Sequence, residues 1–361
     1  MKKVLRISGY PTNRFKSMGK NSYMISGMKS VKTIFIAPRY HGKLLPEPHN
    51  TKVITLPFLV EPSPNGIRKL LHEIMRLKKI FSFSIKAIWI FLKEKPDIIH
   101  IHSPMYFLIA LFAKIYGKRC YITYHGNEHK FIYSKYFIGW FFNVVFFKTF
   151  SLSAQILDYG KAYPYYAKNY ILIDNAVDKS LFFNKGLKRK KIILAVGRLE
   201  IQKDYPTLFN SFKDLLIVQP NYELNIVGSG QDEQSLISLA KKLRISNSVK
   251  FLGHVDQDDL PDLYNKADIF VLCSLWEGFP KVLLEAIASG CKVVATRVDT
   301  IPLILGSSYP FLVNPKDPDD LLSKFISIIS TGEELRSSYL EVLDRYSWVN
   351  IKASMEDEYN R

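Results

Sequence analysis

The sequence has few cysteines, no hydrophobic run long enough to span a membrane, and no recognisable leader. Cys120, Cys273 and Cys291 have apolar neighbours and no metal-binding spacing, which fits a reducing cytoplasm. The apolar stretch 136–147 would extend only about 18 Å as a helix, against a bilayer core of roughly 30 Å. The N-terminal MKKVLRISGY turns polar after a few apolar residues, unlike a signal peptide. These absences predict a cytoplasmic protein.

Acidic residues are scarce in the first half of the chain. Residues 1–180 carry 28 Lys and Arg against 9 Asp and Glu, whereas residues 181–361 carry 22 against 24. The excess predicts an anionic partner, either a membrane surface or nucleic acid, and lysines that serve only solubility are the alternative. Residues 68–95 mix Lys and Arg with Leu, Ile, Phe and Trp as interfacial helices do. This mixture favours the anionic membrane surface, although a buried helix would be equally apolar.

Short apolar strands alternate with longer helical patterns along the whole chain. Such alternation predicts parallel sheets with helices on both faces. Because 361 residues exceed what one core usually serves, we expect an α/β fold with two Rossmann-like domains. The boundary is expected in 174–191, where the hydrophobic periodicity lapses and lysines gather.

The segment SLWEGFPKVLLEAIASGCKVVAT, residues 274–296, contains a helix whose start lacks a capping residue. Pro280 suits the first helical position, but Phe279 stands where Ser, Thr, Asp or Asn would cap the free amides. The segment follows a strand, at the edge where open parallel sheets bind ligands. We therefore expect an anion site, most simply for a phosphate, with water capping as the alternative. Its donors would be the side chain of Lys281 and the amides of Lys281, Val282 and Leu283.

Two glutamates flank this expected site. Glu277 precedes the helix and Glu285 lies more than one turn inside it, so a pair of carboxylates sharing a proton is excluded. We expect each carboxylate to accept hydroxyl groups from a different part of one ligand.

Two cations lie at another strand-to-helix edge of the same half. Arg198 ends a strand and Lys203 follows in the loop, and both could bind a diphosphate. Surface ion pairing with Glu200 or Asp204 is the alternative.

Some motifs suggest metal binding only superficially. Asp256-Gln257-Asp258 directly precedes a helical pattern, which favours helix capping over metal binding. His100 and His102 alternate on one strand and are interpreted as strand-edge residues. No metal site is expected.

Residues 190–300 resemble the donor-nucleotide domain of the retaining glycosyltransferases grouped as family 4, of the kind that build cell-envelope polysaccharides. In the first half, PDIIHIHSP and TYHGNE resemble strand-end motifs of that family, and DNAVD resembles its interdomain turn. The matching motifs of the second half are GRLEIQKDYPTL, LNIVGSGQDEQSL, VKFLGHV and EGFPKVLLEA.

The resemblance implies the GT-B architecture, in which two Rossmann-like domains face each other across a cleft. Residues 1–176 would form the acceptor-side domain and residues 177–345 the nucleotide-sugar-binding domain. Residues 346–361 would form a last helix that crosses back to the first domain.

The resemblance also implies residue roles. Glu285 would bind the ribose and Glu277 the donor sugar, while Arg198 and Lys203 would bind the diphosphate and stabilise its charge as it leaves. His125 would line the donor-sugar pocket, and His254 would lie near the nucleobase unless it is a plain loop histidine. The backbone of the motif would contact the phosphates or the sugar through Gly278, Phe279, Lys281, Val282 and Leu283.

The chain departs from the family pattern in three loops. Gly19, which the resemblance places at the donor, is followed by Lys20 where the family commonly has two adjacent glycines that let the backbone approach the diphosphate. Ala176 and Asp204 stand where glycine is usual or frequent, and both changes are expected to be tolerated.

The function implied is transfer of a hexose or N-acetylhexosamine from a UDP-sugar or GDP-sugar to a glycan acceptor, which we expect to be lipid-linked. The transfer would retain configuration and need no metal or other cofactor. The protein would act in surface polysaccharide synthesis, attached peripherally to the inner face of the cell membrane. An epimerase of the same architecture is the alternative, and it would form product from the donor alone. A nucleic-acid-binding protein is not expected, because no base-reading module is seen.

Overall fold

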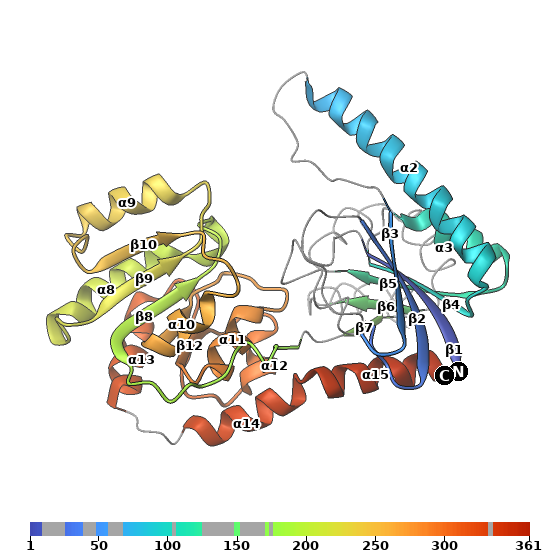
Figure 1. Ribbon diagram of the computed structural model, residues 1–361. Coiled ribbons are helices and arrows are strands. Elements are labelled where there is room, and N and C mark those ends of the chain that lie inside the picture. The colour runs from blue at the N-terminus through green and yellow to red at the C-terminus, as the bar shows by residue number, and fades with distance from the viewer. Residues whose placement is uncertain are drawn as a thin grey trace. The chain divides into compact units, whose positions relative to one another are not determined.

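The computed structural model describes residues 1–8, 26–38, 48–56, 68–102, 106–124, 148–151, 170–172, 176–330 and 335–361. The chain forms two compact units, one of Met1–Asp174 with Trp348–Arg361 and one of Asn175–Ser347 (Figure 1). Each unit contains a parallel sheet with helices packed on it, which confirms the expected pair of Rossmann-like domains. We call them unit 1 and unit 2.

Unit 1 is built on a seven-stranded parallel sheet of order β3-β2-β1-β4-β5-β6-β7. Its strands are β1 (Lys2–Ile7), β2 (Val31–Pro38), β3 (Thr51–Leu56), β4 (Ile98–Ile101), β5 (Arg119–Tyr124), β6 (Lys148–Ser151) and β7 (Tyr170–Leu172). Its helices are α2 (Arg68–Glu94), α3 (Phe107–Ile115) and α15 (Trp348–Asn360). Among all the residues that the structure describes, no helix is both long and apolar enough to cross a bilayer.

The two faces of this sheet differ because successive strand residues point to opposite sides. Leu5 and Ile7 pack with the buried residues of α2 and α3 in one apolar core. Arg6 lies on the opposite face, where its guanidinium donates to the hydroxyl of Tyr359 on α15 at 3.4 Å. Helices α2 and α3 therefore cover one face and α15 covers the other (Figure 1).

The contact between α15 and the sheet is polar. Arg6 is fully buried, and burial lowers the pKa of its guanidinium, which lies 2.9 Å from Nε2 of His102. His100 bonds to the Tyr359 hydroxyl through Nδ1 and to Thr123 through Nε2 at 2.7 Å. His100 and His102 thus join the sheet to the last helix, and no described group of His, Cys, Asp and Glu side chains could hold a metal.

Cations also meet the carboxyl end of α15, where the helix dipole is negative. Lys2 donates to the carbonyls of Tyr359 and Asn360 at 2.9 Å each, and Tyr121 donates to the carbonyl of Glu358 at 3.3 Å. The last carbonyls of the helix are thereby satisfied by side chains from β1 and β5.

Unit 2 is built on a six-stranded parallel sheet of order β10-β9-β8-β11-β12-β13. Its strands are β8 (Lys190–Val196), β9 (Glu223–Val227), β10 (Val249–Gly253), β11 (Ala267–Leu272), β12 (Lys292–Thr296) and β13 (Leu312–Val313). Its helices are η2 (Ile201–Lys203), α8 (Tyr205–Val218), α9 (Glu233–Lys242), α10 (Leu260–Lys266), α11 (Lys281–Ala288), α12 (Ile301–Leu305), α13 (Pro318–Ser330) and α14 (Leu335–Arg345). Helices α8, α9 and α13 form one layer, and α10, α11 and α14 form another.

The loops after β8 and β9 approach each other backbone to backbone. A Cβ atom on Gly228 would lie 1.9 Å from the carbonyl oxygen of Gly197, and one on Gly230 would lie 2.2 Å from that of Leu199. Gly228 also has φ +134°, which side-chain-bearing residues rarely adopt. The glycines of LNIVGSG therefore serve close packing of two loops at the carboxyl edge of the sheet.

We predict that Gly228→Ala and Gly230→Ala each destabilise the protein by about 2 kcal/mol or more, because backbone has to move to admit the methyl group. Thermal unfolding followed by circular dichroism should show melting temperatures lower by about 4 °C or more. Ser229→Ala, at the exposed position between them, is the control and should leave the melting temperature unchanged. Equal melting temperatures for all three variants would contradict this packing.

Candidate functional site

A buried ion pair joins two loops at the carboxyl edge of the unit 2 sheet. Lys203 ends the 3₁₀ turn η2 after β8, and Glu277 lies in the turn between β11 and α11. The Lys203 Nζ binds Oε1 of Glu277, and only 13% and 8% of the two side chains are exposed. The pair brings together two residues that the sequence assigned to one ligand, although it did not predict their direct contact.

The backbone next to β8 leaves room for the lysine. A Cβ atom on Gly197 would lie 2.9 Å from Cε of Lys203, so the aliphatic chain of the lysine runs across the bare backbone of this glycine. An ammonium group carries three donors, and binding Glu277 uses one of them. Lys203 can therefore bind the carboxylate and an anion together.

The Glu277 carboxylate is fixed by its own loop. The Ser274 hydroxyl donates to the same Oε1 at 2.5 Å, and the Glu277 amide donates to Oδ2 of Asp299 at 2.7 Å. The Thr300 hydroxyl holds the carbonyl of Gly278 at 2.6 Å. No partner of Oε2 is found among the residues the structure describes, so this oxygen can accept a ligand hydroxyl.

Gln202 connects η2 to the Glu277 turn through both its side chain and its backbone carbonyl. Its side-chain amide donates to the carbonyl of Trp276 at 2.7 Å, and its own carbonyl accepts the amide of Leu275 at 2.8 Å. Sequence reasoning missed Gln202, Ser274 and Asp299 as positioning residues. Their only sequence signal was adjacency to the motifs, because the contacts join residues far apart along the chain.

Glu285 is buried on α11 with two neutral hydrogen-bond donors. The Tyr264 hydroxyl donates to Oε2 at 3.2 Å, and Nε2 of Gln257 lies 3.5 Å from Oε1. Burial raises the pKa of the Glu285 carboxyl, and Lys281, one turn earlier on α11, partly opposes this shift. The helix thus holds a carboxylate where water is largely excluded, as a site for ribose or sugar hydroxyls requires.

The start of α11 corrects part of the predicted anion site. The helix begins at Lys281 with Pro280 in the capping position, and no side chain caps it. The amide of Leu283 donates to the carbonyl of Pro280 at 3.1 Å, and the Leu283 side chain is fully buried. The prediction that the Leu283 amide faces a ligand is therefore wrong. The amide of Val282 has no partner among the described residues.

Arg198 is placed differently from Lys203. Its side chain is 68% exposed and pairs with Oε1 of Glu200 at 3.0 Å, and Nη2 donates to Gln202 at 3.3 Å. The alternative of surface ion pairing therefore describes Arg198 in this structure. Asp204, which follows η2, has φ +44° in the left-handed region, where glycine is most easily accommodated.

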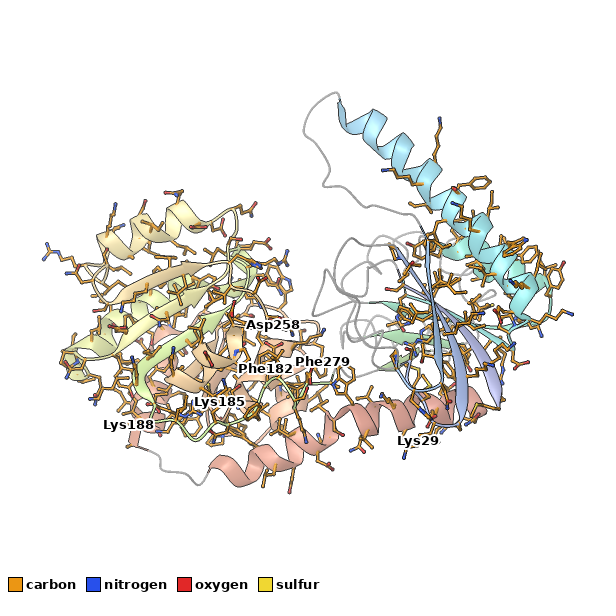
Figure 2. All side chains as sticks on the ribbon, in the orientation of Figure 1. Lys29, Phe182, Lys185, Lys188, Asp258 and Phe279 are labelled. Carbon is orange, nitrogen blue, oxygen red and sulfur yellow. The ribbon has the colours of Figure 1, made fainter. Side chains whose placement is uncertain are left out.

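The remaining predicted residues are distributed over unit 2 or lie outside the described ranges. Phe279, labelled in Figure 2, is half-buried in unit 2, and its ring packs edge-on against that of Tyr346 at 5.3 Å. His254 is exposed, with Nε2 3.9 Å from Oδ1 of Asp256. His125 and Gly19 lie outside the described residues.

The acidic sequence before α10 does not cap the helix through a side chain. Asp259 occupies the capping position without a side-chain bond. The carbonyl of Asp256 instead accepts the amides of Asp259 and Leu260 at 3.0 and 3.3 Å. The expected capping role of the Asp256 or Asp258 carboxylates is therefore not seen at this helix start.

Comparison with known proteins assigns both halves of the chain. Residues 177–341 match the model "Glycosyl transferases group 1", and residues 30–181 match "Glycosyltransferase Family 4". The chain therefore contains one domain of each of these two glycosyltransferase families. Because both models describe glycosyltransferases, they do not favour the epimerase alternative.

Curated relatives match different shares of the chain. An uncharacterized glycosyltransferase of Methanocaldococcus jannaschii is 34% identical over 175 residues, which cover 47% of this chain and 45% of that protein. The match thus spans less than half of that relative's length. Sulfoquinovosyl transferase SQD2 of Arabidopsis thaliana is 26% identical over 98% of this chain and 70% of its own.

A solved structure supports the same fold. HepE of Anabaena, in complex with UDP, aligns with a TM-score of 0.74 over 100% of both chains at 16% identity. At this identity the likeness shows the fold alone, which is the GT-B architecture of two Rossmann-like domains.

Glu285 is predicted to reduce stability at neutral pH. A carboxyl whose folded-state pKa is raised binds protons more readily in the folded state, so stability falls as pH rises from the unfolded pKa through the folded pKa. Glu285→Gln keeps an acceptor for Tyr264 without a charge. We expect it to melt at a higher temperature than the wild type at pH 7.5.

The gain should shrink as the pH falls toward 4.5, because acid favours the neutral carboxyl, which burial stabilises relative to the charged form. Differential scanning calorimetry across this range measures the gain, with Glu341→Gln at an exposed position of α14 as the control. A Glu285→Gln variant that is less stable than the wild type at pH 7.5 would show that the charge stabilises the fold.

Proposed function

We propose that the protein is a retaining transferase that moves a hexose or N-acetylhexosamine from a UDP-sugar or GDP-sugar to a lipid-linked glycan in surface polysaccharide synthesis. The observation that carries the proposal is the buried Lys203–Glu277 pair at the carboxyl edge of the unit 2 sheet, with Glu285 on the following helix. A cation and two separated carboxylates suit a ligand that has a diphosphate and hydroxyls at both ends.

The chain's residues then have distinct roles. Lys203 binds the diphosphate with the donors that Glu277 leaves unused, helped by the Val282 amide and the helix dipole of α11. Glu277 accepts donor-sugar hydroxyls through Oε2, and Glu285 accepts the ribose hydroxyls. Arg198 joins the diphosphate by exchanging its surface partner Glu200 for phosphate oxygens.

The transfer balances without a metal ion. The acceptor oxygen forms a bond to the anomeric carbon as the bond from that carbon to the diphosphate oxygen breaks, and the proton of the acceptor hydroxyl leaves with the nucleoside diphosphate. The leaving group gains negative charge, which Lys203 stabilises. Donor configuration is retained because both bonds lie on the same face of the sugar.

Substitution of the ion pair should stop the reaction. Lys203→Ala and Glu277→Ala are each expected to lower turnover with the true donor and acceptor by about 100-fold or more, as loss of one charge-stabilising donor does in other enzymes. Lys213→Ala, which removes an exposed lysine of α8 paired with Asp214 at 3.5 Å, should retain full activity.

Turnover is measured by release of the nucleoside diphosphate, with and without acceptor. Substantial activity in Lys203→Ala or Glu277→Ala would refute their roles. Conversion of the donor alone to an isomeric nucleotide sugar would support the epimerase instead.

We also propose that α2 attaches the protein to the anionic inner surface of the cell membrane. Phe81, Ile85, Trp89 and Leu92 are 57%, 51%, 63% and 44% exposed and lie on one side of the helix. The opposite side packs into the core through Phe83, Ala87, Ile90 and Phe91.

The charges along α2 support this attachment. Lys79, Lys86 and Lys93 recur every seven residues and run beside the exposed apolar stripe, and all three are exposed. An apolar stripe flanked by lysines suits insertion at the headgroup level of anionic lipids.

Phe81→Ser/Trp89→Ser should therefore lower binding to phosphatidylglycerol vesicles by about tenfold or more, because two apolar side chains no longer leave water. Ile217→Ser/Val218→Ser is the matched control, since these residues of α8 in unit 2 are 78% and 56% exposed. Vesicle sedimentation measures the bound fraction. Equal binding by both variants, or equal binding to neutral phosphatidylcholine vesicles, would contradict the proposal.

A further inference from the structure

A basic hollow lies at the amino-terminal edge of the unit 2 sheet. Its volume is about 430 Å³, and its lining includes Lys190, Lys191, Glu223, Asn225, Lys250 and Lys266. Lys190 and Glu223 start β8 and β9, whereas the Lys203–Glu277 site follows the ends of β8 and β11. The seven residues of β8 separate the two places by about 20 Å at the usual rise of a strand. The hollow is therefore distinct from the proposed donor site.

The hollow has an excess of positive charge. Its one lining carboxylate, Glu223, pairs with Lys250 at 2.7 Å. The nearby Asp268 accepts the Tyr222 hydroxyl at 2.6 Å and lies 3.7 Å from Lys292. Among the described residues Lys190 and Lys266 form no ion pair within 4 Å, although the charge of Lys266 helps to lower the pKa of the Asp262 carboxyl. Lysines from β8, β10 and α10 thus converge on one concavity with too few carboxylates to neutralise them.

Asn225 provides an independent sign of a ligand. Its side chain lines the hollow from β9 and is only 8% exposed, yet its Oδ1 has no hydrogen-bond partner among the described residues. Its neighbours Leu224 and Ile226 point to the other face and lie in the core, as the strand alternation requires. A buried acceptor without a donor is unfavourable. The Oδ1 atom is closed off from solvent as the side chain stands, so rotation of the Asn225 amide would be needed to bring it to a ligand hydroxyl in the hollow.

We propose that this hollow is a second ligand site, which binds a phosphorylated sugar. Lys190, Lys250 and Lys266 bind the phosphate, whose charge they match. Asn225 and the second oxygen of Glu223 accept sugar hydroxyls. The volume lies within the range of small-molecule sites. The same chemistry is offered by a free sugar phosphate and by the phosphorylated polyol headgroup of a lipid.

Isothermal titration with glucose 6-phosphate tests the site directly. Lys190→Gln/Lys266→Gln should weaken binding at least tenfold. The control Lys241→Gln/Lys242→Gln removes the same charge from the exposed end of α9 and should change affinity by less than twofold. Lys203→Gln should bind as the wild type does, which separates failure of this site from failure of the proposed donor site. Equal losses in both lysine pairs, or loss in Lys203→Gln alone, would overturn the proposal.

Asn225→Leu separates a ligand role from a structural one. Removing a buried acceptor that lacks a partner should leave the melting temperature equal to or above that of the wild type, while glucose 6-phosphate affinity falls at least fivefold. A lowered melting temperature would show that the asparagine serves the fold and would overturn its assignment. Inorganic phosphate binding as tightly as glucose 6-phosphate would overturn the hydroxyl contacts.

Vesicles of phosphatidylinositol in phosphatidylcholine distinguish the two sources of the ligand. If the protein binds glucose 6-phosphate, and its binding to these vesicles does not depend on Lys190 and Lys266, the ligand is a free sugar phosphate. Vesicle binding that Lys190→Gln/Lys266→Gln abolishes and Lys241→Gln/Lys242→Gln retains identifies a lipid headgroup. No dependence on Lys190 and Lys266 in either experiment would overturn the proposal.

Discussion

The buried contact between Lys203 and Glu277 is the interaction on which the site in unit 2 depends. Burying two opposite charges gains little net stability, because the loss of hydration offsets much of their attraction. The surrounding loops nevertheless hold the pair firmly: Ser274 shares Oε1, Asp299 fixes the Glu277 backbone, and Gln202 ties η2 to the turn. The pair thus has several supporting hydrogen bonds but adds little net stability, and it lies at the edge where parallel sheets bind ligands. We therefore explain the pair by ligand binding.

Three other features of unit 2 are also unfavourable for stability and lie at a proposed ligand site. Glu285 is a buried carboxylate whose neutral partners stabilise its charge only in part, so its pKa is raised. Asn225 leaves an acceptor unsatisfied beside a group of lysines. Asp204 holds a left-handed conformation directly after the ion-pair lysine. Each feature is locally unfavourable, and each lies at one of the two proposed ligand sites.

The sequence predicted the parts of the structure that depend on local pattern. Alternating strands and helices specified two parallel sheets, and Pro280 with Gly290 bounded α11 to within one or two residues. Spacing alone placed Glu277 in a turn and Glu285 inside a helix. Contacts between distant segments were not predictable in this way. Periodicity carries no information about the hydrogen bond from Gln202 to the Trp276 carbonyl. It also does not show that Lys203 pairs with Glu277 and not with the adjacent Asp204.

The errors have equally specific causes. The first amides of a helix can be satisfied by tightening of the first turn, and this takes the Leu283 amide. The pairing of Arg198 with Glu200 at 3.0 Å was one of the two alternatives that the sequence left open, and the role of Arg198 at a diphosphate stays a prediction. His100 and His102 were interpreted as strand-edge residues, but both are buried, and contacts with α15 and Arg6 hold them, which local pattern does not predict.

A crystal structure with bound UDP or GDP tests the central claim most directly. The account predicts the diphosphate within hydrogen-bond distance of Nζ of Lys203, with the ribose hydroxyls on Glu285 and the Lys203–Glu277 contact intact. A nucleotide bound elsewhere on unit 2, with these three side chains unengaged, would contradict it.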